Sequence, residues 1–183
     1  MRITRALALW LLVALTIPTF AEGQSVPSTG PVIHSAGAVF EIPSPEFETP
    51  ADGPYRLAFE MARASDSPGD VNVLLDSVAR YLNMHVRAAV PADRVTAAVV
   101  VHGTAGWEML NHEAYRERHG VDNPNADLIR ELVAAGVRVI LCGQTAAARG
   151  IPRDRLLDEV EVALSAMTAF LVLQDQGFRV NPW

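Results

Sequence analysis

Residues 123–145 read NPNADLIRELVAAGVRVILCGQT, and this stretch decides the fold. Its first part carries apolar residues at three- to four-residue spacing, which predicts a helix with one apolar face. Gly136 follows the last turn of that pattern, as glycine often does just past a helix end. The apolar, β-branched run over 137–143 is typical of a strand buried on both faces. It contains Cys142, the single cysteine of the chain.

The same alternation of strands and helices extends from Tyr55 to the end of the chain. Such alternation over one core predicts a three-layer α/β/α domain with a mostly parallel five-stranded sheet, flavodoxin-like in general architecture. The predicted strands are 55–62, 95–103, 137–143, 160–166 and 178–183, and the predicted helices are 71–89, 106–120, 123–136 and 167–177, with short helical turns over 144–160.

The N-terminus has the features of a secretory signal peptide. Two arginines in MRITR precede the apolar run 6–17, which Pro18 ends. The run is shorter than the roughly 20 residues of a spanning helix, so we expect residues 1–21 to be cleaved and the protein to be periplasmic or secreted. After cleavage no membrane contact is expected. An uncleaved membrane anchor is the alternative.

Residues 22–54 form a different kind of segment. Six of the twelve prolines fall there, and no apolar period is sustained. Proline fixes φ and removes a backbone donor, so we expect an extended lead to the domain of residues 55–183. Its apolar patch, residues 38–42, is predicted to add one edge strand.

Composition excludes several classes of function. The chain has 15 basic and 21 acidic residues and a net charge of −6, which disfavours nucleic acid as a partner. Every basic residue is arginine, so a P-loop phosphate site and Schiff-base chemistry lack their lysine. No Gly-x-Gly-x-x-Gly, Gly-x-Ser-x-Gly or His-Glu-x-x-His motif occurs. We therefore predict no metal and no cofactor.

Three polar, small-residue stretches follow predicted strands: 102–106, 142–145 and 165–168. Ligands and catalytic groups gather at the carboxyl ends of the strands in open α/β sheets, so these stretches are expected to form one pocket. Its predicted members are His102, Gly103, Thr104, Cys142, Gly143, Gln144, Thr145, Ser165 and Thr168.

Cys142 is the candidate nucleophile of this pocket. A helix opening at Gln144 and Thr145 would lower the pKa of its thiol, and His102 or Arg149 would be its positive partner. Free cysteine is also among the most buried residue types, so Cys142 as a small core residue is an equal alternative. A cysteine–histidine hydrolase with His102 as base is formally open, although no third, orienting group is identified.

The stretch from Tyr55 to Trp183 resembles the DsrE/DsrF-like family. VVVHG (99–103), residues 123–151 and residues 160–183 carry the resemblance, and the helix–glycine–strand–Cys-Gly-Gln order is its most specific part. The resemblance implies a three-layer domain, assembly into homotrimers or hexamers, and a sulfur carrier that holds sulfur as a persulfide on Cys142. It also implies sulfur donor and acceptor proteins as partners. A binding or assembly module without catalysis, with Cys142 structural, is the alternative function.

Overall fold

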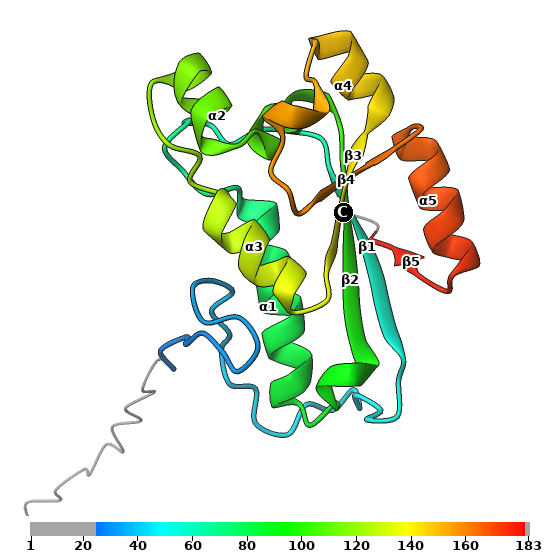
Figure 1. Ribbon diagram of the computed structural model, residues 1–183. Coiled ribbons are helices and arrows are strands. Elements are labelled where there is room, and N and C mark those ends of the chain that lie inside the picture. The colour runs from blue at the N-terminus through cyan, green and yellow to red at the C-terminus, as the bar shows by residue number, and fades with distance from the viewer. Residues whose placement is uncertain (1–24, 182–183) are drawn as a thin grey trace, which may run out of the picture.

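The computed structural model describes residues 25–181, and the predicted signal peptide lies outside them. Five strands form one sheet in the order β4-β3-β2-β1-β5, and all neighbouring strands run parallel (Figure 1). The predicted five-stranded α/β fold is confirmed, and the sheet is wholly parallel. The strands are β1 (Tyr55–Met61), β2 (Val95–Val101), β3 (Arg138–Cys142), β4 (Val160–Ala163) and β5 (Arg179–Val180).

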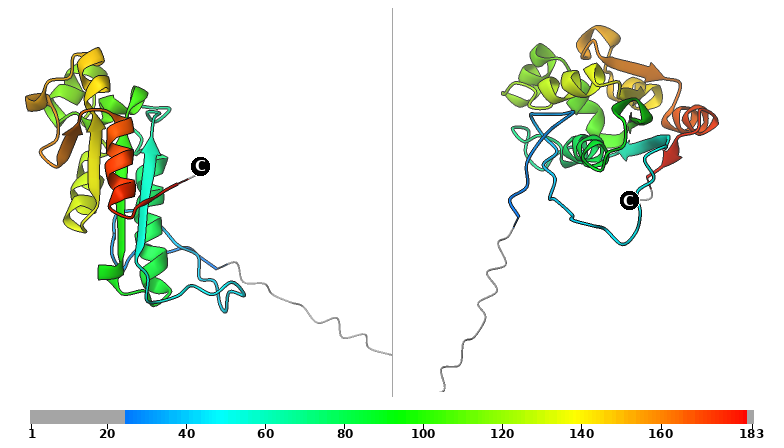
Figure 2. Two further views of the ribbon diagram at one scale, coloured as in Figure 1. Left: turned by 90° about the vertical axis from the view of Figure 1, so that its right-hand side faces the viewer. Right: turned by 90° about the horizontal axis from the view of Figure 1, so that it is seen from below.

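Helices cover both faces of this sheet, as a three-layer fold requires. α1 and α3 lie on one face and α5 on the other, while α2 and α4 lie at the carboxyl end of the strands (Figures 1 and 2). The helices are α1 (Val73–Arg87), α2 (His112–His119), α3 (Ala126–Ala134), α4 (Gly143–Arg149) and α5 (Ala166–Asp175), with 3-10 turns η1 (Ala92–Arg94), η2 (Gly103–Met109) and η3 (Arg153–Arg155).

The strand order explains why α5 stands apart from the other helices. From β1 to β4 each new strand is added on the same side, and then β5 returns to pair with β1. Crossovers between parallel strands are right-handed, so a reversal of direction places the connecting helix on the opposite face. The chain therefore changes faces between β4 and β5.

Two core clusters follow from the alternation of side chains along the strands. The larger one lies under α1 and α3 and includes Val99 and Leu141, which are fully buried. The smaller one lies under α5 and includes Val100, Ile140 and Leu173. Within residues 25–181 only α5 covers that second face, so it has the thinner cover.

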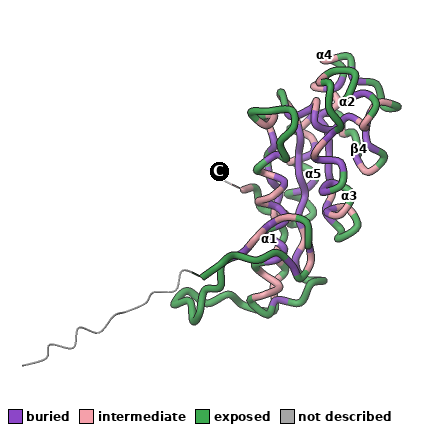
Figure 3. Tube along the Cα trace, turned by 90° about the vertical axis from the view of Figure 1, so that its left-hand side faces the viewer, coloured by how far each residue is buried: buried purple, intermediate pink, exposed green. Residues whose placement is uncertain are grey.

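The lead, residues 25–54, runs over α1 and α3 without regular secondary structure, and most of it is exposed (Figures 1 and 3). Ile33 is its anchor and is fully buried in the larger core cluster. The predicted edge strand at residues 38–42 is wrong, because Val39 makes only an isolated bridge with Ser28. The edges of the sheet are β4 and β5 instead.

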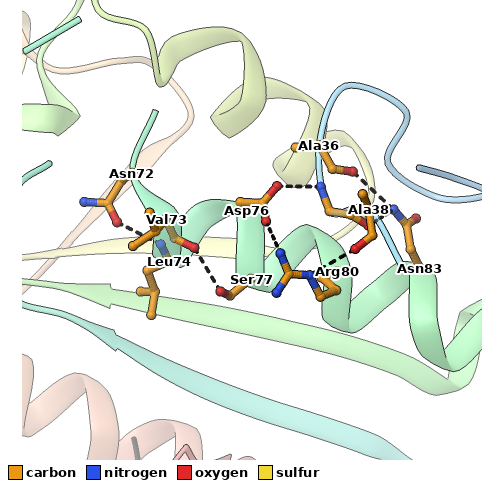
Figure 4. A network of polar contacts seen from close by, with 10 residues as sticks. Ala36, Ala38, Asn72, Val73, Leu74, Asp76, Ser77, Arg80 and Asn83 are labelled. Atoms are coloured by element: carbon orange, nitrogen blue, oxygen red, sulfur yellow. Dashed lines mark hydrogen bonds and ion pairs between the residues drawn. The ribbon is translucent and has the colours of Figure 1, made fainter. Parts of the chain in front are cut away.

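Side chains of the helices hold the backbone of the lead in place (Figure 4). Asn83 is fully buried in α1, accepts hydrogen bonds from two backbone N–H groups of the lead and donates to three of its carbonyls. Asp76 accepts from Gly37 N at 2.8 Å, and Arg80 donates to Ala38 O at 3.1 Å. Glu131 of α3 accepts from His34 N at 2.7 Å. The lead is thus an integral layer of the fold.

Residues 25–181 contain no helix that is both long and apolar enough to cross a membrane.

Candidate functional site

Cys142 lies between two neighbouring strands, β3 and β4, whose following helices pack on opposite faces of the sheet. It ends β3 and pairs with Ala163, the last residue of β4. The chain after Cys142 enters α4, whose Ala146 packs in the larger core cluster. The chain after Ala163 enters α5 on the opposite face. A crevice between strands whose connections leave to opposite faces is the usual ligand position in open α/β sheets.

Backbone N–H and hydroxyl groups at the starts of both helices lower the pKa of the Cys142 thiol. Burial raises the pKa of this thiol, but the backbone N–H and hydroxyl of Thr145 and the backbone N–H groups of Ala166 and Gln144 outweigh it. The pKa of Cys142 is therefore held below its ordinary value. Hydrogen bonds to a charged form favour that form, so this cradle stabilises the thiolate.

Gly143 makes this close approach possible. A Cβ atom at position 143 would lie 2.5 Å from the carbonyl oxygen of Ala163 and 3.3 Å from that of Leu164. Any other residue would push β4 and the start of α5 away from Cys142. The glycine of the Cys-Gly-Gln motif is thus needed for packing, and its role is to keep the cradle closed.

His102 follows β2 on the same face of the sheet as Cys142. Val101 and Leu141 are partners in the β2–β3 register, and His102 and Cys142 are the residues that follow them at the carboxyl ends of the two strands. Side chains alternate between faces along a strand, and Val101 and Leu141 both point into the larger core cluster. His102 and Cys142 therefore both face the α5 side.

Glu60 orients the His102 ring. Its carboxylate Oε1 lies 2.8 Å from His102 Nε2, and Glu60 belongs to β1, the next strand along. Glu60, His102 and Cys142 thus lie in a row across three neighbouring strand ends. Sequence reasoning missed Glu60, because an exposed carboxylate in an alternating strand is indistinguishable from an ordinary solvent-facing residue. It is the third, orienting group that the sequence did not identify.

Gly103 and Thr104, predicted to bind substrate, shape the turn after β2. Gly103 has φ of +57°, and a Cβ there would lie 2.4 Å from the carbonyl oxygen of Ala62. Thr104 Oγ1 accepts a hydrogen bond from the backbone N–H of Ala64 at 3.0 Å. Both residues therefore join the ends of β1 and β2, at the His102 side of the row.

The other predicted members hold the second helix start. Gln144 is exposed, and its side-chain amide donates to Leu164 O at 3.3 Å. Ser165 caps α5, because its Oγ accepts from Thr168 N at 3.0 Å. These contacts fix α5 beside α4 and so position the N–H of Ala166.

Arg149 does not serve as the positive partner of Cys142. Its Nε donates to Gly103 O at 2.7 Å, and its guanidinium lies 5.8 Å from the centre of the Trp107 ring. Neither Arg149 nor His102 is among the groups that shift the pKa of Cys142. Neutral donors at the helix starts do this work instead.

Among residues 25–181, no group of three or more histidine, cysteine or acidic side chains could hold a metal ion. His119 stacks on Tyr115 with ring centres 4.4 Å apart. His85 binds the backbone of Tyr81 through Nδ1 at 2.8 Å. These histidines therefore act within the fold.

The model of the DsrE/DsrF-like family matches residues 48–182. A solved structure from Methanobacterium thermoautotrophicum, protein of unknown function MTH1491, is 26% identical with a TM-score of 0.47, over 69% of this chain and 97% of that one. The ychN protein of E. coli is 16% identical with a TM-score of 0.48, over 69% of this chain and 96% of that one. A search of curated proteins found no match.

Proposed function

Because the chain belongs to the DsrE/DsrF-like family, we propose that it carries sulfane sulfur as a persulfide on Cys142. One observation carries this proposal: Cys142 lies at a strand end between the starts of α4 and α5, and donor groups at these two helix starts lower the pKa of its thiol. The thiolate is the nucleophile in sulfur exchange. A lowered pKa provides that species at a pH where an ordinary thiol is mostly protonated.

Loading and unloading are two exchanges of the same kind. In loading, the Cys142 thiolate attacks the outer sulfur of a polysulfide or protein persulfide, a new S–S bond forms, and the donor's S–S bond breaks with its electron pair leaving on the donor thiolate. In unloading, an acceptor thiolate attacks the outer sulfur on Cys142. The Cys142–sulfur bond then breaks, and the electron pair returns to Cys142 in its cradle. Neither exchange needs an external oxidant.

His102 and Glu60 supply proton transfer in this scheme. Glu60 holds Nε2 of His102 and fixes the ring, as a carboxylate does for a catalytic histidine. His102, which follows the adjacent strand end, accepts the thiol proton before loading and returns a proton to the acceptor product. Glu60 is a positioning residue in this account.

The burial of Cys142 selects slender donors. The residue is only 6% exposed. A polysulfide chain is narrow enough to reach such a sulfur, whereas a bulky thiol reagent is not. We therefore expect polysulfide to react with native Cys142 much faster than a bulky maleimide does.

We further propose that the protein is exported and forms a homotrimer or hexamer that exchanges sulfur with donor and acceptor proteins. The apolar run 6–17 supports export. Exposed apolar side chains beside the crevice support assembly, because patches of this kind mark interfaces. These side chains are Val162 in β4, Leu164 just after β4, and Met167, Leu171 and Val172 on α5.

Intact mass of the protein after polysulfide treatment tests the proposed function. The native chain should gain one or more sulfur atoms that a reductant removes, and Cys142→Ala should gain none. A native chain that stays unmodified, and whose thiol is silent to iodoacetamide until unfolding, would contradict the proposal.

Two alternatives rest on specific observations. The burial of Cys142 favours a binding or assembly module in which the thiol fills space, and this would follow if Cys142→Ala kept both assembly and cellular function. The Glu60–His102 pair favours a cysteine hydrolase. That activity would appear as thioester turnover that Cys142→Ala abolishes.

A further inference from the structure

A hollow of about 370 Å³ lies between η2, α2 and the turn after α4, away from the crevice of Cys142. Its volume falls in the lower part of the range for small-molecule pockets, roughly 300–1,000 Å³. Leu110 and Ile151 form an apolar floor, and both are buried. Trp107 forms one wall, and Arg118 and Arg155 reach the rim.

Arg118 is held in place but not neutralised. Its guanidinium carbon lies 3.4 Å from the centre of the Trp107 ring, which is a close stack of the two planar groups. Within residues 25–181 it makes no hydrogen bond or ion pair. Stacking leaves the N–H groups at the edge of the guanidinium plane free to donate. Arg118 is thus a pre-oriented fork of donors.

The neighbouring charges do not cancel that of Arg118. Glu117, the one acidic residue of the lining, is paired with Arg155. Arg116, two positions along α2, is paired with Asp122, so it differs from Arg118 in this respect. Burial and then the positive charge of Arg118 lower the pKa of His119 against a smaller opposite effect of Glu108. The hollow therefore has one uncompensated positive charge on an apolar floor.

We propose that this hollow binds a small organic anion, with a carboxylate or sulfonate head on Arg118 and an apolar body against Trp107 and Ile151. A planar two-oxygen head matches the guanidinium fork and can accept two parallel hydrogen bonds. The apolar body gains from the floor, where water has no polar partner. The ligand class is thus set by one charge and one flat apolar surface. The proposal does not depend on sulfur chemistry at Cys142.

Calorimetric titration of the whole protein with sodium benzoate tests this site. Benzoate should bind saturably at low ionic strength, with a dissociation constant of about 1–10 mM. Benzyl alcohol, which has the same ring without the charge, should bind much more weakly. Arg118→Gln should weaken benzoate binding at least about tenfold, because it removes a charge-assisted hydrogen bond.

Arg116→Gln is the matched control, since it removes an exposed arginine from the same helix and should leave benzoate affinity unchanged. Circular dichroism of both variants should match that of the native chain. Three results would overturn the proposal: no saturable benzoate binding, equal affinity for benzyl alcohol, or native affinity in Arg118→Gln.

Discussion

Of the two faces of the sheet, the one under α1 and α3 carries a second cover, the lead, whereas in the described part of the chain α5 alone covers the opposite face. On the first face the lead is fastened by buried or partly buried side chains, with Asn83 at the centre. On the second face Leu164 is 73% exposed and Met167 75% exposed. The lead is therefore a structural layer, and the α5 side keeps apolar surface exposed.

The contacts that stabilise the fold through the lead and the groups that act on Cys142 therefore lie on different faces of the sheet. Most hydrogen bonds from the helices to the lead are made to its backbone, so they depend little on the side chains of that segment. The donor groups at the starts of α4 and α5 act on one reactive atom, the Cys142 sulfur, and lower its pKa. Substitutions on the two faces should consequently have different readouts.

The largest effect is expected for Asn83→Ala. It leaves several buried backbone groups of the lead without partners, at about 1–3 kcal/mol for each group that stays dry. We expect the free energy of unfolding to fall by about 3 kcal/mol or more, measured by urea titration. Ser77→Ala on the same helix should change it by less than about 0.5 kcal/mol. Near-native stability of Asn83→Ala would show that the lead is only loosely attached.

A smaller loss is expected for Gly143→Ala. The added Cβ would meet the Ala163 carbonyl at 2.5 Å, so the backbone must shift. Overpacking of this kind costs about 1–3 kcal/mol. Gly69→Ala is the control, because the nearest atom to its Cβ would be 4.0 Å away. If Gly143→Ala were as stable as Gly69→Ala and as reactive as the native thiol, the crevice would be looser than we describe.

Thr145→Val sharpens the comparison at the crevice. It removes the Thr145 hydroxyl, one of the groups that lower the pKa of Cys142, while keeping the shape of the side chain, so this pKa should rise. The rate of iodoacetamide alkylation at neutral pH should fall about two- to fourfold. A higher pKa lowers the fraction of thiolate, but the more basic thiolate is a better nucleophile, which offsets part of that loss. Unfolding free energy should stay close to native. Thr96→Val, in β2, should alter neither quantity.

The smallest expected effect is the pH dependence of the stability that Glu131 contributes by binding the lead. Burial raises the pKa of Glu131, but hydrogen bonds from the Ser35 hydroxyl and from the backbone N–H groups of His34 and Ser35 outweigh it, so the pKa is lowered. A carboxylate with a lowered folded-state pKa stabilises the fold above its unfolded pKa, and this contribution is lost as pH falls through the folded pKa.

The stability difference between native chain and Glu131→Gln should therefore be full at pH 7 and shrink below the ordinary pKa of glutamate, about 4.3. Urea titrations across that range measure it. Glu113→Gln on α2 serves as control. A difference that grows on acidification would have the wrong sign for this account.

The sequence predicted most of the strands and helices of the domain because their patterns are local, but the edge strand at residues 38–42 was wrong and the predicted helix 106–120 is split between η2 and α2. Helix 123–136, buried strand 137–143 and the Cys-Gly-Gln turn follow from apolar period and glycine placement. The position of Cys142 at a strand end follows from the same reading. The order of the strands does not, because register and crossover direction depend on contacts between distant segments.

The crevice was only partly predictable for the same reason. The backbone N–H groups of Gln144 and Thr145 were expected near the sulfur, since they begin the next helix. The N–H of Ala166 comes from another strand end, and Glu60 reaches His102 across a strand boundary. The hydrogen bonds of Asn83 to the lead also have no sequence signal, because their partners are backbone N–H and C=O groups, which nearly every residue carries.

The most direct test of the central claim is an ultraviolet titration of the Cys142 thiolate in the folded protein, with Cys142→Ala subtracted. Cys142 is the single cysteine, so the difference belongs to one group. In the native chain the titration midpoint of the Cys142 thiol should lie below about 8.5, the ordinary pKa of a free cysteine. In Thr145→Val the midpoint should be higher. A native midpoint at or above that value, or no titration until the protein unfolds, would contradict the account.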